Sequence, residues 1–334
     1  MTLPPEWNEQ SFVQIVFPHN KTDWNQYLEE ALETFVNIAK TISKYQKCLI
    51  ITKNLVQAKS FFSHLDNLIF VQLDTNDTWS RDFGAITVQN KNEFIALDFE
   101  FNAWGKKFPY NLDNKITQKL KNTSLLELYK HKSIPFVLEG GSIDSNGNGI
   151  ILTTKCLLEK NRNPDLTQNE IEKKLLEYFG ATKILWLNNG YLEGDDTDSH
   201  IDTLARFVSE DTIVYQSCED ENDIHYRELK KMENELLNFT QLNGNKFKII
   251  ALPWIQAKYY LNERLPATYA NFLIINGAVL VPIYDDKNDK KALEIFKNIF
   301  PKRDIIGIDC QVLLRQHGSL HCVTMQYPKI QKEF

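Results

Sequence analysis

One order of predicted elements recurs along the sequence: two short strands joined by a tight turn, then a helix, then another strand. Complete copies of this order lie at 84–139, 141–187, 203–252 and 269–308. An incomplete copy at 23–52 has the helix and the last strand but lacks the hairpin. Such a repeat restricts the fold, because repeated units bury their apolar faces against their neighbours.

The two ends of the chain can supply the missing hairpin. One strand-like run remains at 12–18 and another at 320–326. We therefore predict an α/β fold of five ββαβ units, in one domain spanning residues 1–334, closed by its terminal strands. Closure of repeats around an axis leaves a central cleft in which loops from several units can meet.

Local signals support these elements. The segment 23–45 places apolar residues at helical spacing. Thr167 and Glu170 have the spacing of a capping box at the start of the helix over 167–179, and Gly180 suits its end. Asn276-Gly277 between two apolar runs is typical of a hairpin turn.

Composition narrows the function classes. Hydrophobic residues make up 43% of the 334 residues and the formal net charge is −6, which disfavours nucleic acid as a partner. The apolar runs are too short for a membrane helix, and the polar, proline-containing start indicates no signal peptide. We therefore expect a cytoplasmic protein with no membrane partner, whose five scattered cysteines are reduced.

The densest polar cluster lies at 194–207. It contains His200 and Asp202, two residues apart, which in an extended segment would point to the same face. Such a pair suits a base beside a cation-binding carboxylate, or a metal site, or simply a solvated acidic turn. Two weaker candidates are Trp79 with Arg81 and Asp82 at the entry to a hairpin, and Glu139 followed by two glycines at a strand end.

Cys322 lies in the last predicted strand, with His321 beside it. On a strand, His321 would point to the opposite face and could not serve as its base. The histidines and cysteines lack the spacing of a metal site, so we expect no metal and no cofactor. The segment 144–149 resembles the start of a calcium loop, but Lys155 stands where that loop needs Glu, so we predict a hairpin turn. Taken alone, Cys322 is either a buried filler or a nucleophile.

Five segments, at 76–86, 138–144, 195–208, 264–274 and 317–326, resemble in order the motifs of the agmatine deiminase family. This family belongs to the bacterial peptidylarginine deiminase branch of the guanidine-modifying pentein superfamily. The resemblance spans residues 12–328 and implies a five-bladed, pseudo-symmetric α/β propeller. It also implies hydrolysis of agmatine in polyamine biosynthesis, with a small cationic guanidine as the partner and homo-oligomers as an option.

The resemblance also assigns roles to residues. It implies Cys322 as the nucleophile, His200 as the general acid and base, and Glu139 and Asp202 as further catalytic residues. Asp82, Trp79 and Asp198 are expected to bind the substrate. Carboxylates suit a guanidinium, which is planar, always charged and able to form bidentate hydrogen bonds.

The sequence departs from the family pattern at three places near these residues. Phe83 and Ala85 stand where Thr and Pro are common, Ser199 stands where Gly precedes the histidine, and a run of glycines before the cysteine is reduced. No catalytic side chain is lost. Three alternatives stay open, namely a peptidylarginine or other guanidine deiminase, a cysteine amidohydrolase acting on a neutral amide, and a binding protein without activity.

Overall fold

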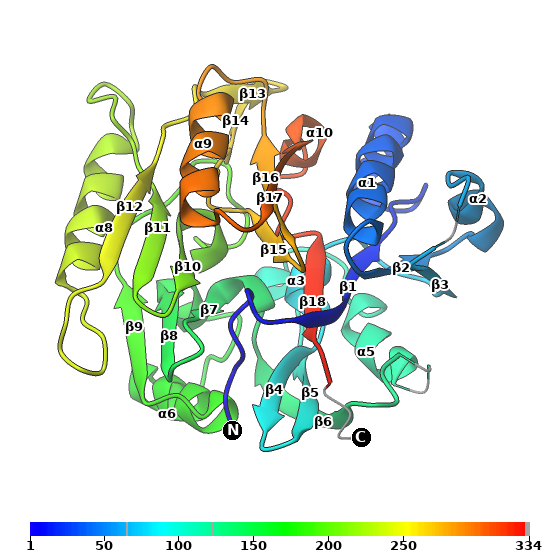
Figure 1. Ribbon diagram of the computed structural model, residues 1–334, viewed down its shortest axis with the longest axis horizontal. Helices are drawn as coiled ribbons and strands as arrows, with labels where there is room; N and C mark the ends of the chain where they lie inside the picture. The colour runs from blue at the N-terminus through cyan, green and yellow to red at the C-terminus, as the bar shows by residue number, and fades with distance from the viewer. Residues whose placement is uncertain (65, 122, 124, 331–334) are drawn as a thin grey trace.

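The computed structural model describes residues 1–330 except 65, 122 and 124 (Figure 1). Within these residues, five sheets of three or four strands repeat one pattern, and a sixth sheet is a two-stranded hairpin. In each of the five, an antiparallel pair is followed by a strand that joins in parallel. The pairing follows the predicted hairpin–helix–strand order, in a mixed α/β fold.

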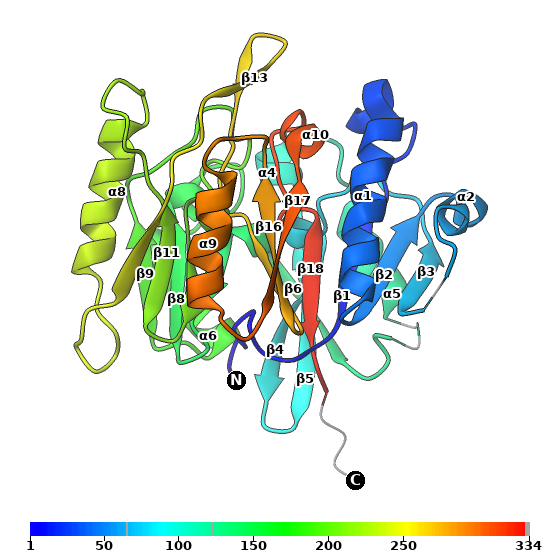
Figure 2. The ribbon, with the colours of Figure 1, turned by 45° about the horizontal axis from the view of Figure 1, so that its top comes forward.

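The first sheet joins the two ends of the chain. Its strands, in spatial order, are β18 (Thr324–Pro328), β1 (Gln10–Val16), β2 (Lys47–Thr52) and β3 (Leu68–Gln72). Strand β18 lies antiparallel beside β1, as both ribbon views show (Figures 1 and 2). The predicted pairing of the terminal runs is therefore confirmed, although the last strand begins at Thr324 and not at residue 320.

The other four large sheets have three strands each. They are β4 (Ile86–Asn90), β5 (Glu93–Glu100) and β6 (Lys130–Val137); β7 (Ile143–Ser145), β8 (Ile150–Thr154) and β9 (Lys183–Leu187); β10 (Ala205–Ser209), β11 (Thr212–Gln216) and β12 (Lys248–Leu252); and β15 (Leu273–Ile275), β16 (Ala278–Ile283) and β17 (Asp304–Asp309).

Amphipathic helices connect the second and third strands and cover the sheets (Figure 1). The longest are α1 (Leu28–Ser43), which follows the short helix η1 (Asp23–Tyr27), then α6 (Gln168–Phe179), α8 (Tyr226–Asn238) and α9 (Asp289–Ile299). The second unit uses shorter pieces, α4 (Ala103–Lys106), η2 (Asp113–Lys115) and α5 (Ile116–Leu120), and the third adds η4 (Lys155–Leu158) before α6.

The local signals behave as predicted. Thr167 and Glu170 form a complete capping box at the start of α6, and Gly180 ends this helix in the left-handed conformation. Gly277 has a φ of 75° between β15 and β16, where a tight hairpin turn requires a positive φ. The segment 144–149 lies in the hairpin between β7 and β8.

Several elements were not predicted. Helix α2 (Leu55–Ser60) and strand β3 extend the first unit, and β13 (Lys258–Tyr260) with β14 (Glu263–Leu265) forms a hairpin that projects at the top of Figure 2. Four short helical turns also precede the first strands of hairpins. They are α3 (Ser80–Phe83), η3 (Gly140–Ser142), α7 (Ile201–Leu204) and α10 (Gln311–Leu314).

The expectation of an extended segment from His200 to Asp202 is wrong. His200 is the N-cap residue of α7, and Asp202 lies within this helical turn. The segment turns because Thr203 donates hydrogen bonds from its backbone and its hydroxyl to the His200 carbonyl.

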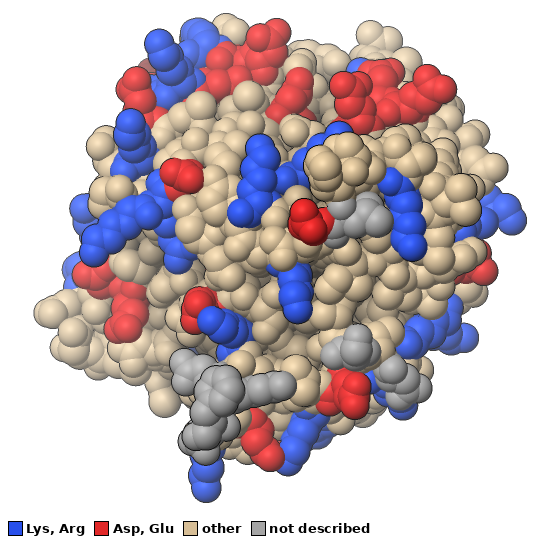
Figure 3. All heavy atoms as spheres, turned by 45° about the vertical axis from the view of Figure 1, so that its right-hand side comes forward, with Lys and Arg blue, Asp and Glu red and all other residues tan. Residues whose placement is uncertain are grey.

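The surface charges and the cysteine thiols have ordinary chemistry. Acidic and basic side chains are interspersed on the face shown in Figure 3. All five cysteines are free thiols. Among the described residues, no helix combines the length and the apolar character needed to cross a bilayer.

The closure of the chain by β18 predicts a stability effect. Tyr327 of β18 is fully buried, and its ring stacks on Phe12 of β1 with 4.4 Å between ring centroids. Replacing Tyr327 by Ala leaves a cavity at this seam, so we expect a loss of about 3–5 kcal/mol in the free energy of unfolding. Denaturant unfolding measures this, with Tyr259→Ala as the control, because Tyr259 is 63% exposed. Equal stability of the two variants would contradict a structural role for the seam.

Candidate active site

A cavity of about 290 Å³ lies where the entry turns of several units meet. Trp79, Trp104 and Phe108 form its aromatic walls. Its acidic lining comes from Asp23, Asp77, Asp82, Asp195 and Asp196, and Cys322, His317 and Gly318 complete one side. Among the described residues, no lysine or arginine lines this cavity.

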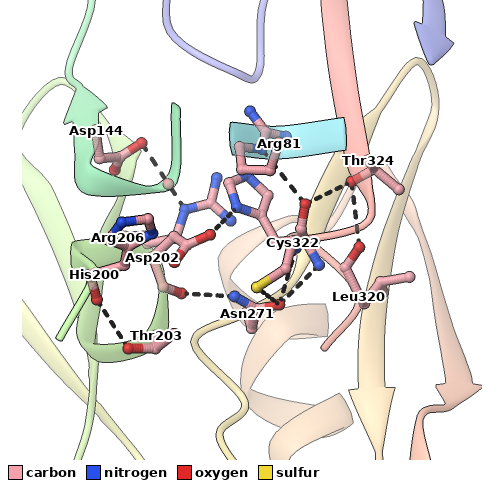
Figure 4. Close-up of polar contacts among 12 residues, drawn as sticks. Arg81, Asp144, His200, Asp202, Thr203, Arg206, Asn271, Leu320, Cys322 and Thr324 are labelled. Atoms are coloured by element: carbon pink, nitrogen blue, oxygen red, sulfur yellow. Dashed lines mark hydrogen bonds and ion pairs between the residues drawn. The ribbon is translucent and has the colours of Figure 1, made fainter. Parts of the chain in front are cut away.

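Cys322 lies in the turn between α10 and β18, not in a strand as predicted. Its Sγ lies 3.4 Å from the side-chain oxygen of Asn271, which also accepts the backbone N–H of Cys322 (Figure 4). Asn271 in turn donates to the carbonyl of Asp202, so it ties the cysteine to the α7 turn. Burial raises the pKa of the Cys322 thiol well above its usual range, and the charges of Asp202 and Asp82 raise it further.

His200 and two carboxylates converge on Gly141. A methyl group added to Gly141 would lie 2.7 Å from His200 Nδ1, 2.9 Å from an oxygen of Asp82 and 3.0 Å from an oxygen of Asp202. No side chain fits there, so glycine permits the close approach that the sequence suggested at this strand end. Residues from three different units are thus brought together.

Asp82, in the α3 turn, is held by two donors. Its Oδ1 accepts the Gly141 N–H at 3.0 Å and its Oδ2 accepts the Trp104 indole N–H at 2.9 Å. His200 Nδ1 lies 3.6 Å from Oδ1. Burial raises the pKa of Asp82 to about 6, helped by nearby Asp202 and Glu139 and opposed by His200.

Two buried polar atoms in this group have no hydrogen-bond partner among the described residues. They are Asp202 Oδ1 and His200 Nε2. The other oxygen of Asp202 lies 2.7 Å from His321 Nδ1. Buried polar atoms are rarely left unpaired, so these two are candidates to contact a bound ligand.

Glu139 is fully buried and paired with a residue that sequence reasoning missed. Arg162 Nε donates to both of its oxygens, at 2.9 and 3.1 Å. The same guanidinium donates to Asp198 and to the Thr197 carbonyl, each at 2.8 Å. His200 Nε2 lies 4.0 Å from Glu139, which leaves the carboxylate next to the imidazole. Arg162 follows a short helix outside the recognised motifs, so no local signal identified it.

Of the predicted site residues, Cys322, Asp82 and Trp79 line the cavity, whereas His200, Asp202 and Glu139 are buried next to Asp82 and Asp198 turns away from this group. Its oxygens face Arg162 and Lys107, each at 2.8 Å. The backbone explains this orientation, because Asp198 and Ser199 both have positive φ values, 65° and 70°. Asp195 and Asp196, from the same acidic run, line the cavity instead.

Trp79 lies in the wall of the cavity. Its ring packs near Trp24, with 5.6 Å between centroids, and near Trp104 at 6.5 Å. A methyl group on Gly318 would lie 2.2 Å from the Trp79 ring, so this glycine lets the chain pass over the indole. The departures Phe83, Ala85 and Ser199 do not line the cavity.

No group of three or more His, Cys, Asp or Glu side chains is arranged to hold a metal ion in the described part of the chain. What the site does offer is a sulfur atom and several carboxylates in one aromatic-walled cavity, with the His200 imidazole buried beside Asp82. This set suits nucleophilic chemistry on a cationic group.

Comparison with known proteins agrees with this chemistry. A family model described as Porphyromonas-type peptidyl-arginine deiminase matches residues 2–328. A curated relative from Mycoplasma mycoides subsp. mycoides, named "Putative agmatine deiminase", is 32% identical over 351 residues, covering 98% of this chain and 95% of the relative.

Two solved structures are similar over nearly their whole length. One, of "a putative peptidyl-arginine deiminase", is 48% identical with a TM-score of 0.95 and covers 98% of both chains. The other is a C. jejuni agmatine deiminase with a cysteine-to-serine substitution and bound substrate. It is 46% identical with a TM-score of 0.92, covering 97% of this chain and 95% of that chain. This chain therefore belongs to the Porphyromonas-type peptidyl-arginine deiminase family.

Proposed function

We propose that the protein is a hydrolase that converts agmatine and water into N-carbamoylputrescine and ammonia, a reaction of polyamine biosynthesis. The observation that carries this proposal is the convergence of His200, Asp82 and Asp202 on Gly141, since Asp82 also lines the cavity that contains Cys322. Support comes from the similar C. jejuni enzyme, an agmatine deiminase solved with its substrate.

Binding of the guanidinium uses the buried carboxylates. Asp82 and Asp202 Oδ1, which has no hydrogen-bond partner in the described part of the chain, accept N–H groups of the substrate, while Trp79 and Trp104 cover its planar faces. These contacts turn the central carbon toward Cys322. Holding the two reactants in this geometry lowers the barrier by several kcal/mol.

The substrate also activates the nucleophile. The buried thiol beside two carboxylates holds its proton in the free enzyme. A bound guanidinium places a positive charge next to the sulfur and offsets the carboxylates, so the thiol passes its proton to His200 and becomes a thiolate.

The reaction then proceeds in two halves. The thiolate attacks the guanidinium carbon, His200 returns the proton to one amino nitrogen, and ammonia leaves as the S-alkylthiouronium forms. Water next gives a proton to His200 and attacks the same carbon, and the C–S bond breaks. His200 then returns its proton to the sulfur, and the hydroxyl proton of the ureido product passes to solvent, where the released ammonia takes it up. In each half His200 therefore acts first as base and then as acid. Glu139 beside Nε2 stabilises the protonated imidazole in both halves.

The alternatives fit the cavity less well. A peptidyl-arginine substrate agrees with the family description, but Cys322 is only 6% exposed and shares its cavity with Trp79, Trp104 and Phe108, which favours a small molecule. A neutral amide gains nothing from the acidic lining. Cys322 and His200 are both present, which favours activity over binding alone.

We also infer that the five large sheets are the blades of a pseudo-symmetric propeller within one catalytic domain. The repeated strand order and the pairing of β1 with β18 support this arrangement. The acidic residues of the cavity then come from different blades around one axis.

The nucleophile can be tested directly. Cys322→Ser should abolish ammonia release from agmatine, because a serine hydroxyl is far less nucleophilic than a thiolate. Cys218→Ser is a matched control, since the Cys218 sulfur already donates to a backbone carbonyl, as a hydroxyl can. Mass spectrometry of quenched wild-type reactions should find a substrate adduct on the peptide with Cys322. Normal turnover by Cys322→Ser would refute the mechanism.

The substrate tail gives a second prediction. The cavity has several acidic residues and, among those described, no lysine or arginine to meet an α-carboxylate. We expect kcat/KM for agmatine to exceed that for free arginine by about 100-fold or more, because like charges brought together cost several kcal/mol. Parallel assays with agmatine, arginine and a blocked arginine peptide measure this. Equal turnover of arginine would overturn the agmatine assignment, and preference for the peptide would reassign the substrate.

The pKa of Asp82 gives a third prediction. Asp82 offers a negative charge to the guanidinium only when it is ionised, and its pKa is about 6, so kcat/KM should fall about tenfold per unit as the pH drops below about 6. Unfolding of the protein caused by protonation of Asp82 would not explain the loss of kcat/KM. A carboxyl with a raised folded pKa contributes stability at low pH, and that contribution disappears as pH rises through 6. Circular dichroism at each pH checks that the protein stays folded. A flat profile down to pH 5 would contradict the role of Asp82.

A further inference from the structure

A chain of three buried side chains runs from the N-terminal segment to the active-site carboxylate Asp202. His321 Nδ1 lies 2.7 Å from Asp202 Oδ2, and His321 Nε2 lies 2.7 Å from Glu6 Oε2. Glu6 is 6% exposed, His321 3% and Asp202 0%. Neither Glu6 nor His321 takes part in the mechanism above, and Glu6 lies outside the five recognised motifs.

Proton counting limits the states of this chain. An ionised carboxylate only accepts hydrogen bonds, so both ring nitrogens of His321 must donate when Glu6 and Asp202 are ionised. A neutral ring would leave one of the two contacts without a proton. The hydrogen-bonded series Glu6–His321–Asp202 therefore holds one proton more than it would with a neutral imidazole between two ionised carboxylates.

Glu6 is itself held in a fixed place. Its Oε1 accepts the Ile274 N–H at 2.7 Å, and its Oε2 lies 2.8 Å from Arg206 and 3.6 Å from Arg81. Figure 4 shows Arg81, Arg206 and Asp202 gathered beside Cys322. Burial and the charges of Arg206 and Arg81 lower the pKa of His321, while Glu6 and Asp202 oppose them. The two 2.7 Å contacts each need a proton, so we infer that Glu6 supplies the charge that lets the ring donate twice.

The effect reaches the substrate through Asp202. Burial alone would raise the pKa of Asp202, but the His321 hydrogen bond and nearby positive charges hold it below its usual range. The bond also uses Oδ2 and leaves Oδ1 without a partner among the described residues. We propose that Glu6 and His321 are positioning residues, which keep Asp202 ionised with Oδ1 turned to the guanidinium. The inference rests on the proposed function and adds two residues to it.

The first test is spectroscopic and independent of activity. Nitrogen-15 labelling of histidine reports whether each ring nitrogen carries a proton, and the His321 signals are assigned by their loss in His321→Gln. We expect both ring nitrogens of wild-type His321 to be protonated at pH 8. In Glu6→Gln, the ring should release a proton below that pH. A wild-type ring with one unprotonated nitrogen at pH 8 would overturn the proposal.

The second test measures substrate binding. In the Cys322→Ser background, Glu6→Gln should raise the Kd of agmatine about tenfold, the loss expected when one charge-assisted hydrogen bond is weakened. In the Cys322 protein, Glu6→Gln should raise KM more than it lowers kcat, and the acidic limb of kcat/KM should move to higher pH. Glu9→Gln is the matched control, because Glu9 lies in the same segment but pairs with Lys329 at the surface.

The outcomes separate the two proposals. A folded Glu6→Gln protein with unchanged Kd, KM and pH profile would overturn the positioning role while leaving the deiminase assignment intact. Failure of the Cys322→Ser protein to bind agmatine would overturn the proposed function. The ring protonation of His321 is measured on the wild-type protein. It therefore tests the hydrogen bonds from His321 to Glu6 and Asp202 even if Glu6→Gln does not fold.

Discussion

Crowding of negative charge around a buried sulfur is the constraint on which the site depends. Carboxylates removed from water are unstable unless a cation or hydrogen-bond donors balance them. Arg162 balances Glu139, and the His321–Arg206 side balances Asp202. Asp82 has only N–H donors and a nearby imidazole, and its pKa is raised accordingly. The protein thus leaves part of the negative charge uncompensated, and that remainder suits a cationic substrate.

The repeat explains how distant residues supply this charge. Asp82 lies in α3, Asp202 in α7, and Cys322 just after α10, so each lies shortly before the first strand of its hairpin. Gly141, in η3 before β7, and Asn271, shortly before β15, occupy the equivalent places in the other two units. Because every unit presents its entry turn at the same position, one structural rule brings five separate stretches of sequence together.

Local chemistry made much of the fold predictable. Capping residues, the Asn-Gly turn and apolar periodicity act over a few residues, so they could be read without knowledge of the rest of the chain. The site was less accessible. His200 and Asp202 were expected on an extended segment, whereas a helical turn carries them, and contacts with other units settle where they point. Arg162 and Glu6 gave no signal because their roles depend on partners far away in sequence.

The loop before His200 shows how such distant contacts govern a catalytic position. Asp198 and Ser199 both adopt left-handed backbone conformations, which cost roughly 1–2 kcal/mol each for a residue with a side chain. The related family has glycine at the second position, where this cost vanishes. Here the Ser199 N–H donates to Asp195 at 2.6 Å, and the Ser199 carbonyl accepts from Thr154 at 2.7 Å.

These bonds offset the strain, and Arg162 adds its own bond to the Thr197 carbonyl. The loop is therefore held from three sides: by its own aspartate, by the β8 strand and by the arginine that also neutralises Glu139. Serine is tolerated at position 199 because these contacts together fix the left-handed backbone conformation. The imidazole of His200 therefore stays beside Asp82 and Glu139, on a backbone with less conformational freedom than glycine would give.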